Sequence, residues 1–365
     1  MRIALFTGEL SGETYAYYIL KSLAVKLKGN LEAFGIGGPN LSKLEFFSKL
    51  SDISELSIVG VVEVLKKVRR LWRLLHRCAD KVLREFPEIV LLIDSPDFNL
   101  RLAKLLRKRG WSGKIVYFIP PTAWIWRSGR AKTLRSYCDL VITLFDFEAE
   151  WFSSRGIPAV FLGHPLLDIL PERELIRKMG GLKKPVLACF PGSRRGEVKH
   201  LLPVMMEVSV RWPGDALFSK VPSLERSLYG DIDNLYEVPS YVLLESCDFA
   251  LAASGTIAVE ALIYEKPMIV VYKGNPLNYL IYKILVNAKF VSMPNIMEGS
   301  EIYPELIQRE AVPSNILEIL ERWLEREDNV IEIRKKLRRL KRRLGNKGAV
   351  DRIASRLIDE TTSSC

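Results

Sequence analysis

Short apolar runs rich in β-branched residues alternate with longer amphipathic stretches along the 365-residue chain. Such short apolar runs are typical of strands buried on both faces, and the stretches between them have helical periodicity. The alternation therefore predicts βαβ units, and hence an α/β fold of parallel sheets with helices on both faces. The predicted strands are 3–6, 89–93, 115–119, 140–144 and 160–162, and in the second half 186–190, 216–219, 249–252 and 268–272.

The segment 163–185, between the two sets of strands, is rich in glycine, proline and charge, as linkers are. The chain is also about twice the usual domain length. We therefore expect two doubly wound, Rossmann-like domains that meet near residue 166 and face each other across a cleft. Because open α/β sheets bind ligands at the carboxyl ends of their strands, the residues just after each strand are the candidate site.

Lys and Arg outnumber Asp and Glu by 54 to 43, a formal net charge of +11. The excess favours an anionic partner, and phosphate, nucleic acid and an acidic membrane surface all stay open. The five cysteines show no CxxC pairing and the three histidines have no second ligand nearby, so we expect reduced thiols and no metal. A signal-peptide core and a membrane-spanning run are both missing, which predicts a cytoplasmic protein with at most a surface attachment to membrane.

The turn Pro191-Gly192-Ser193 follows a predicted strand, and Arg194 and Arg195 stand at the start of the helical pattern after it. A helix start offers backbone N–H groups and a positive dipole end, and Arg194 adds a forked donor, so the turn is suited to a diphosphate. The alternative is an ordinary strand-to-helix turn with solvated arginines.

A second turn, Ser254-Gly255-Thr256, also joins a strand to a helix, and Glu260 lies one helical turn further on. Small residues there allow a phosphate to approach the backbone, and the carboxylate can accept hydrogen bonds from ribose hydroxyls. Two such turns in one half suggest a nucleotide, although small residues for helix-sheet packing would also explain the second. Neither turn is a GxGxxG or P-loop motif, so neither a dehydrogenase nor an NTPase is supported.

Acidic residues stand after two strands of the first half. Asp94 ends a wholly apolar strand and Asp97 follows it, so one of the pair is a candidate general base, with helix capping as the alternative. In the first loop Glu9, Ser11 and Glu13 are expected near the cleft, where turn chemistry and N-capping by Ser11 would also account for them.

The stretch 61–77 reads as a basic amphipathic helix. An apolar stripe that carries tryptophan beside a cationic rim is typical of helices that lie in a membrane interface. The alternative is a surface helix packed on its own sheet. The residues expected to contact the membrane are Val64, Val68, Leu71, Trp72, Arg69 and Arg73.

Ten segments taken together resemble, in order and spacing from about residue 3 to 313, the lipid-A-disaccharide synthase family of inverting glycosyltransferases. The segments are TGELSGE, SIVGVVEVL, IDSPDFNLRLAK, AWIWRSGRAK, LFDFEAEWF, GHPLLD, PGSRRGEVKHLLPV, ASGTIAVEAL, PMIVVYKGNPL and PNIMEGSEIYPELIQ. The chain departs from the usual family form at Gly12-Glu13, where the family has Gly-Asp, and at IPPTAW, which replaces a Ser-Pro version. Both departures bear on contacts with the acceptor.

The resemblance implies a two-Rossmann enzyme of the GT-B type, with 1–166 as the acceptor-binding and membrane-contact domain, 167–340 as the UDP-sugar domain, and 341–365 as a helix that returns to the N-terminal domain. The implied reaction joins UDP-2,3-diacylglucosamine to 2,3-diacylglucosamine 1-phosphate through a β-1,6 linkage and releases UDP, with no cofactor and no metal. Asp94, with Asp97 close by, and Arg194 match residues that the family needs for activity. Seven residues fall in segments that line the family's UDP site: Ser193, Ser254, Gly255, Thr256, Glu260, Asn295 and Glu301.

Two alternatives stay open. One keeps the fold and changes the reaction to that of a UDP-N-acetylglucosamine 2-epimerase or a peptidoglycan-type N-acetylglucosaminyltransferase. The other is a non-catalytic, basic RNA- or membrane-binding protein. The resemblance favours diacylated sugar substrates and the inner-membrane surface as partners rather than nucleic acid, and it leaves a homodimer open.

Overall fold

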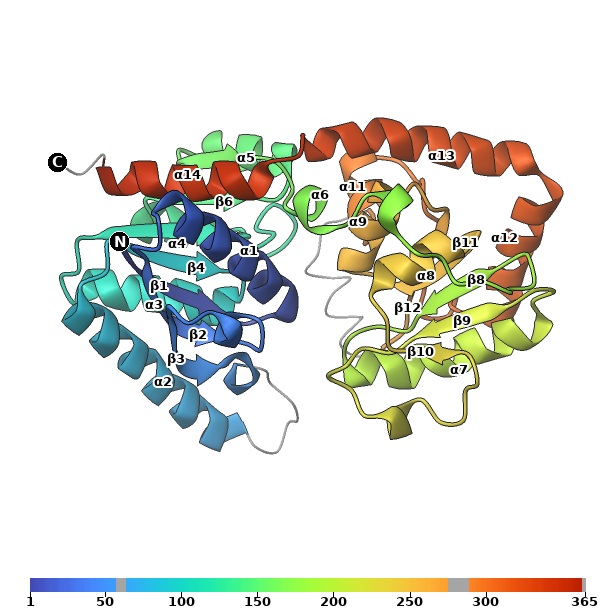
Figure 1. Cartoon of the computed structure of the whole chain (residues 1–365), viewed down its shortest axis with the longest axis horizontal. Coiled ribbons are helices and arrows are strands. Elements are labelled where there is room, and N and C mark those ends of the chain that lie inside the picture. Colours follow the sequence, from blue (N-terminus) through green and yellow to red (C-terminus); the bar gives the residue numbers. More distant parts are fainter. Residues whose placement is uncertain (57–63, 275–288, 363–365) are drawn as a thin grey trace. The chain divides into compact units, whose positions relative to one another are not determined.

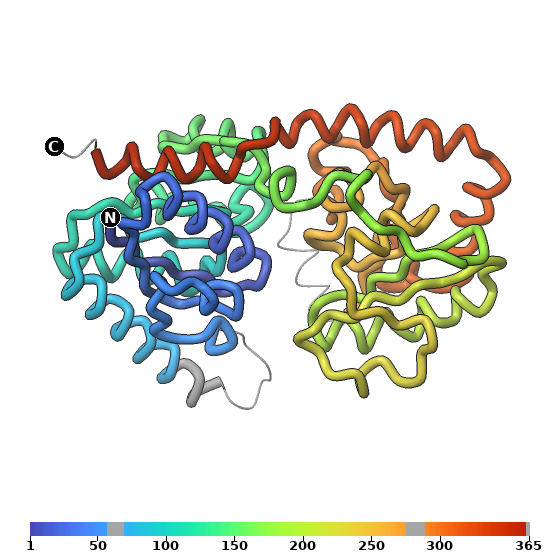
Figure 2. The backbone as a smooth tube through the Cα atoms, in the orientation of Figure 1, coloured from blue at the N-terminus to red at the C-terminus, as the bar shows by residue number. Residues whose placement is uncertain are grey.

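The computed structural model describes residues 1–56, 64–274 and 289–362. The chain forms two compact units, Met1–Ile169 with Leu344–Cys365, and Leu170–Arg343. The backbone passes from the first unit to the second after residue 169 and returns after residue 343, as the trace in Figure 2 shows. The sequence-based boundaries were residues 166 and 340.

The first unit is built on a seven-stranded parallel sheet in the order β3-β2-β1-β4-β5-β6-β7 (Figure 1). Its strands are β1 (Arg2–Thr7), β2 (Glu32–Gly37), β3 (Phe47–Asp52), β4 (Ile89–Ile93), β5 (Lys114–Phe118), β6 (Leu140–Thr143) and β7 (Ala159–Phe161). Five of them confirm the strands predicted for this half. The sequence missed β2, which contains two glycines, and β3, an edge strand with polar residues on its exposed side.

Helices cover both faces of this sheet, as its fully buried central strands require. They are α1 (Leu10–Lys26), α2 (Val64–Glu85), α3 (Pro96–Lys108), α4 (Gly129–Tyr137), α5 (Asp146–Ser153), α6 (Leu166–Ile169) and α14 (Ala349–Thr362). Side chains of α2, α3 and α4 share one core with the sheet, and α1 packs against α14.

The last helix is joined to the first unit by hydrogen bonds at its start. The two carboxylate oxygens of Asp168 accept from the N–H groups of Gly348 at 2.5 Å and Val350 at 2.7 Å. The Arg352 guanidinium donates to the carbonyl of Leu162 at 2.8 Å. Asp168 therefore caps α14, which explains the aspartate of the segment GHPLLD.

The second unit contains a six-stranded parallel sheet in the order β10-β9-β8-β11-β12-β13. Its strands are β8 (Leu187–Phe190), β9 (Ala216–Ser219), β10 (Leu235–Tyr236), β11 (Phe249–Ala253), β12 (Met268–Tyr272) and β13 (Glu305–Ile307), of which only the short β10 and β13 at the edges were not predicted. Its helices are α7 (Arg195–Arg211), α8 (Ser240–Ser246), α9 (Thr256–Ile263), α11 (Met293–Glu298), α12 (Pro313–Glu325) and α13 (Glu327–Lys341). Apolar side chains of α7 and α12 form one core with this sheet.

Candidate active site

Asp94 stands in a strained turn directly after β4. Asp94 and Ser95 have φ values of 51° and 45°, a left-handed conformation that costs energy for residues other than glycine. The Asp94 N–H donates to the carbonyl of Phe118 at 3.0 Å, and the Asp94 carbonyl accepts from the Tyr117 hydroxyl at 2.6 Å and the Asn99 amide at 2.8 Å. Asp94 is half-buried. Its backbone is thus fixed on both sides at the carboxyl edge of the sheet.

Asp97 has a different environment, in the first turn of α3. Its side chain is 72% exposed, and Oδ1 accepts from Arg130 at 2.7 Å and Arg127 at 3.3 Å. The Arg127 guanidinium lies 4.2 Å from the ring centre of Trp126. Asp97 therefore orders the aromatic loop that precedes α4, and two guanidinium groups already occupy one of its oxygens.

The three acidic and polar residues predicted for the first loop are placed differently from one another. Glu9 is exposed at the N-cap of α1, without a side-chain capping bond, and Ser11 is half-buried inside the helix, so the alternative explanation of N-capping by Ser11 does not hold. Glu13 is fully buried and accepts from the Asn40 amide at 2.9 Å and the Leu41 N–H at 2.7 Å. Glu13 therefore anchors the segment after β2 instead of pointing toward a ligand.

The turn between β8 and α7 is closed by a carboxylate from its own helix. Oε2 of Glu197 accepts from the N–H groups of Ser193 at 3.0 Å and Arg194 at 3.3 Å, and Oε1 lies 3.5 Å from the Arg194 guanidinium. Gly192 has φ 117°, and a methyl group there would lie 2.4 Å from that carboxylate. The sequence predicted N–H groups open to an anion, and this is wrong for residues 193 and 194 because Glu197 fills the position. The Arg194 side chain itself is 68% exposed.

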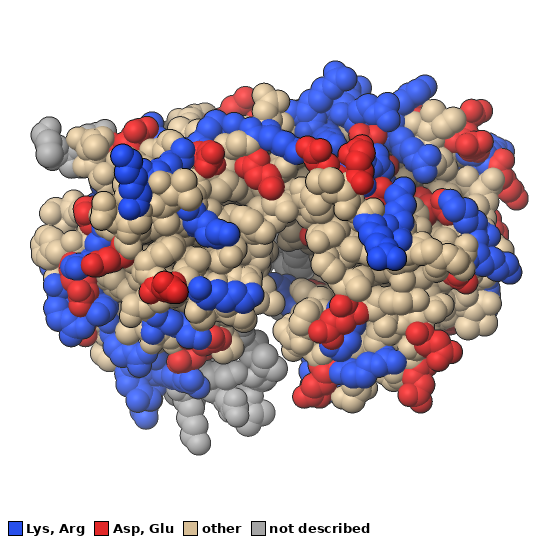
Figure 3. Space-filling model, in the orientation of Figure 1, with Lys and Arg blue, Asp and Glu red and all other residues tan. Residues whose placement is uncertain are grey.

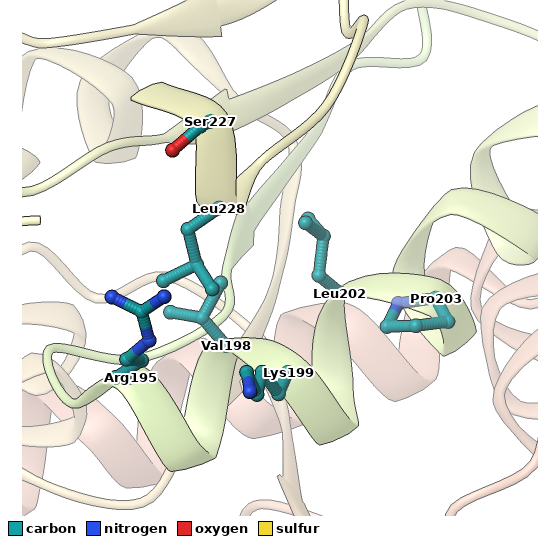
Figure 4. A pocket seen from close by; sticks show the side chains of 7 residues that line it. All are labelled: Arg195, Val198, Lys199, Leu202, Pro203, Ser227 and Leu228. Carbon is teal, nitrogen blue, oxygen red and sulfur yellow. The ribbon is translucent and has the colours of Figure 1, made fainter. Parts of the chain in front are cut away.

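A shallow pocket of about 360 Å³ runs beside this turn, along α7 (Figure 4). Arg195 and Lys199 contribute cationic groups from α7, and the 3₁₀ turn Arg226–Leu228 forms the facing wall. The remaining lining residues are Val198, Leu202, Pro203, Ser227 and Leu228. Arg195 also lies 3.8 Å from Glu225, so the two neighbouring arginines have different partners.

The turn between β11 and α9 leaves Gly255 and Thr256 exposed. Ser254 donates its hydroxyl to the carbonyl of Val291 at 3.1 Å, which ties the turn to the segment before α11. One helical turn into α9, Glu260 accepts a hydrogen bond from the Ser240 hydroxyl. Burial raises the pKa of Glu260 to about 7, and the hydrogen bond from Ser240 only partly opposes that rise. This carboxyl group therefore changes charge near neutral pH.

The polar residues of the α11 region form an internal network. Asn295 is fully buried: its amide donates to the Tyr303 carbonyl at 2.7 Å and to Glu305 at 2.8 Å, and its oxygen accepts from the N–H groups of Ile302 and Tyr303. Asn295, which the resemblance places in a segment that lines the UDP site, thus has its amide nitrogen and oxygen bonded within the protein. Glu301 is exposed, and its pKa is raised by partial burial and by the charge of Glu305. Glu305, which the sequence did not single out, is the acceptor at the centre of the network.

Glu148 is a buried acid that lies after β6. The Trp124 indole donates to Oε1 of Glu148 at 3.1 Å, and the same indole meets the Phe147 ring edge-on with ring centres 4.9 Å apart. Burial raises the pKa of Glu148 to about 7, against the hydrogen bond from Trp124 and two backbone N–H groups. Glu148 thus holds the aromatic loop 120–127 at the edge of the first sheet.

Helix α2 combines a packed side with an exposed basic one. Leu74 and Cys78 are buried in the core of the first unit, and Leu71 is half-buried. Trp72 is 60% exposed, and Arg69 and Arg73 are exposed beside it. In Figure 3, Lys and Arg side chains gather at the lower left, over the region where α2 lies in Figure 1. The side chains of Val64 and Val68 lie outside the described residues.

Within residues 1–56, 64–274 and 289–362, no group of three or more His, Cys, Asp or Glu side chains is arranged to hold a metal ion. In the same ranges, none of the helices combines the length and apolar character that crossing a bilayer requires.

Two Rossmann-like units of parallel strands, each with charged or polar turns at the carboxyl edge of its sheet, define an α/β protein of the GT-B type. Solved structures share this fold: a Phytolacca americana UGT2 complexed with UDP-2-fluoro-glucose and pterostilbene (TM-score 0.61, 12% identity, 99% of each chain) and a Neisseria meningitidis UDP-GlcNAc 2-epimerase bound to UDP-GlcNAc (TM-score 0.58, 14% identity, 100% of each chain). At these identities the likeness concerns the fold alone.

The sequence comparisons are more specific. The family model described as lipid-A-disaccharide synthetase matches residues 3–355. Lipid-A-disaccharide synthases from Myxococcus xanthus and Geobacter sulfurreducens are each 32% identical to this chain over 98% of its length and 97% of theirs, and that of Pseudomonas syringae pv. tomato is 34% identical over 88% of both. The chain belongs to the lipid-A-disaccharide synthetase family, a family of glycosyltransferases.

Proposed function

We propose that this chain joins UDP-2,3-diacylglucosamine to 2,3-diacylglucosamine 1-phosphate, forming a β-1,6-linked disaccharide 1-phosphate and releasing UDP. The observation that carries the proposal is the match to lipid-A-disaccharide synthases over 98% of the chain, which extends across both units. The epimerase alternative rests on fold likeness alone, at 14% identity.

For the acceptor half of the reaction, we assign the general base to Asp94. In-line attack on the anomeric carbon requires that the acceptor 6-hydroxyl lose its proton as the new glycosidic bond forms. Asp94 stands at the carboxyl edge of the first sheet with its backbone held in an unusual conformation, which is common at functional sites. Asp97, whose oxygen already accepts from Arg127 and Arg130, orders the neighbouring loop in this scheme.

For the donor half, Arg194 stabilises the negative charge that grows on the diphosphate as the bond to the sugar breaks. A fixed donor of this kind is worth roughly 3 kcal/mol in the transition state. The Ser193 hydroxyl and the exposed turn at Gly255 and Thr256 supply further donors, and Glu260 accepts from the ribose hydroxyls. Because these groups are permanently present in the chain, the reaction is proposed to need no metal, and the same rate with and without a chelator is the expected result.

The test uses purified protein, both diacylated substrates and quantification of UDP and disaccharide. Asp94→Asn should abolish turnover while Asp97→Asn retains part of it, with folding checked by circular dichroism. Non-acylated UDP-N-acetylglucosamine serves as the comparison substrate. Epimerisation or transfer of that simple sugar, without activity on the diacylated pair, would refute the proposed function.

We further propose that α2 attaches the protein to the inner membrane from the cytoplasmic side. An exposed Trp72 flanked by Arg69 and Arg73 suits the interface of an anionic bilayer, where the indole leaves water and the guanidinium groups meet phosphates. Burying one aromatic side chain is worth about 1.5–3 kcal/mol, so Trp72→Ala should weaken binding to vesicles of phosphatidylethanolamine and phosphatidylglycerol by about tenfold or more. Phe86→Ala is the control, because Phe86 is also an exposed aromatic, 72% accessible, just beyond the end of α2. Equal binding by the two variants would show that α2 is not the attachment surface.

A further inference from the structure

The strained turn at Asp94 is held by a buried side chain from the next helix. Asn99, in the first turns of α3, is fully buried. Its amide nitrogen lies 2.8 Å from the Asp94 carbonyl oxygen, 3.1 Å from that of Ile93 and 3.2 Å from that of Phe6. One side chain therefore joins the ends of β1 and β4, two adjacent strands of the sheet, to the turn.

The orientation of the Asn99 amide follows from these partners. Only the NH₂ group can face three carbonyl oxygens, since the amide oxygen would be repelled by all of them. The amide oxygen is buried and has no hydrogen-bond partner among the described residues. Buried polar atoms in native proteins are nearly always paired, and the exceptions concentrate where function requires them. The Asn99 amide thus directs its donor group at the end of β1, the end of β4 and the Asp94 turn.

Tyr117, on the neighbouring strand β5, provides the second support. It is fully buried, and its hydroxyl donates to the Asp94 carbonyl at 2.6 Å. Burial raises the pKa of Tyr117 well above its ordinary value, and the charge of Asp94 adds to this effect, so the hydroxyl keeps its proton and stays a donor. The turn is also closed from the β1 side, where a methyl group on Gly8 would lie 2.4 Å from the Ser95 hydroxyl oxygen.

We infer that Asn99 and Tyr117 are positioning residues for the reaction, which hold the Asp94 backbone in its left-handed conformation and so aim the carboxylate. The Asp94 N–H is bound to the Phe118 carbonyl, and the Asp94 carbonyl is bound by both positioning residues, so the backbone from which the carboxylate projects is fixed on both sides. The inference rests on the proposed function, in which Asp94 is the base.

The test compares Tyr117→Phe with Tyr303→Phe in the full-length chain. Tyr303 is the matched control because it is equally buried and also donates its hydroxyl to a carbonyl, that of Lys266 at 3.2 Å, in the other unit. Small displacements of a catalytic group can cost about a hundredfold in rate, and we expect Tyr117→Phe to lower kcat by about tenfold with both KM values nearly unchanged. Asn99→Asp, which places an oxygen against three carbonyls, should lower kcat further. Tyr303→Phe should lower the melting temperature comparably and leave kcat unchanged.

A kcat for Tyr117→Phe equal to that of Tyr303→Phe would overturn the inference, as would a loss that appears only in KM or only in the folded fraction. Raising the pH separates positioning from altered ionisation, since a misplaced carboxylate is not rescued at any pH. Asp94→Asn in the same assay tests the underlying assignment. An active Asp94→Asn would refute the base, whereas an inactive Asp94→Asn with a fully active Tyr117→Phe would refute the positioning role alone.

Discussion

The two turns assigned to chemistry, one in each unit, are held in opposite ways. The Asp94 turn is fixed by neutral, buried donors, Tyr117 and Asn99, that bind its carbonyl. The turn at Arg194 is fixed by a charged acceptor, Glu197, that binds its N–H groups from a largely exposed surface. A base must be aimed, and buried hydrogen bonds fix a direction firmly. A phosphate donor must instead exchange partners with an incoming anion, which an exposed ion pair permits.

The largest effect in the second unit is expected from Arg194→Ala. Loss of a donor that acts on growing charge should raise the activation free energy by about 3 kcal/mol, and so lower kcat/KM roughly a hundredfold. The neighbouring Arg195 is the control, because it is similarly exposed and lies 3.8 Å from Glu225. Steady-state kinetics of UDP release measure both variants. If Arg195→Ala loses as much activity as Arg194→Ala, the charge of the whole helix start matters and the assignment to one residue is wrong.

Substitutions of Glu197 separate its two contributions to the same turn. Glu197→Gln keeps an oxygen that accepts from Ser193 and Arg194 but removes a negative charge beside the phosphate site, so we expect UDP to bind a few-fold more tightly, mainly at low salt. Glu197→Ala removes the acceptor as well and should lower the free energy of unfolding by about 1 kcal/mol, as loss of a helix cap does. Isothermal titration with UDP and chemical denaturation provide the two readouts. Identical behaviour of the two variants would mean that the charge, rather than the acceptor, holds the turn.

The central strands and the order of the motifs were predictable because both are local. A run such as 89–93 is apolar at every position and needs no partner to be identified as a buried strand. The edge strand β3 was missed because it has exposed polar residues and so lacks a continuous apolar run. The edge strand β10 was missed because its two residues are too few to show a period. A turn between a strand and a helix was also predicted at 191–193, and the structure has one there between β8 and α7.

The way in which each turn is held was only partly accessible from sequence. Glu197 stands three residues after the N-cap Arg194, which is a capping-box spacing that could have indicated the closed turn. No comparably specific signal existed for Asp94, because aspartate, although enriched among left-handed residues, adopts that conformation in only a small share of cases, and Asn99 reaches Phe6 across 93 positions of sequence. Asn295 and Glu13 were predicted near the ligand from their segments, yet both are buried and used internally. Position in a motif is local information, whereas the direction of a side chain is set by tertiary packing.

The smallest expected effect concerns pH and compares two acids, one in each unit: Glu148, which is buried, and Glu260, which is half-buried. Burial raises the pKa of both Glu260 and Glu148 from 4.5 to about 7. A carboxyl group with a raised folded-state pKa contributes stability that is present at low pH and is lost as the pH rises from about 4.5 to about 7. Replacing either residue by glutamine should therefore raise the melting temperature at pH 8, where the wild type carries a charge that its surroundings disfavour.

UDP binding distinguishes these two acids. Only Glu260 is proposed to accept hydrogen bonds from the ribose, and its carboxylate form accepts them best. The wild type should therefore bind UDP more tightly than Glu260→Gln at high pH, and this advantage should shrink as the pH falls through about 7. Taking the ratio of the two affinities cancels the titration of UDP itself. Glu148→Gln should keep the wild-type pH dependence, since Glu148 belongs to the first unit and holds Trp124. If Glu148→Gln lost the wild-type pH dependence of UDP affinity, or if Glu260→Gln kept that dependence, the ribose would be bound elsewhere.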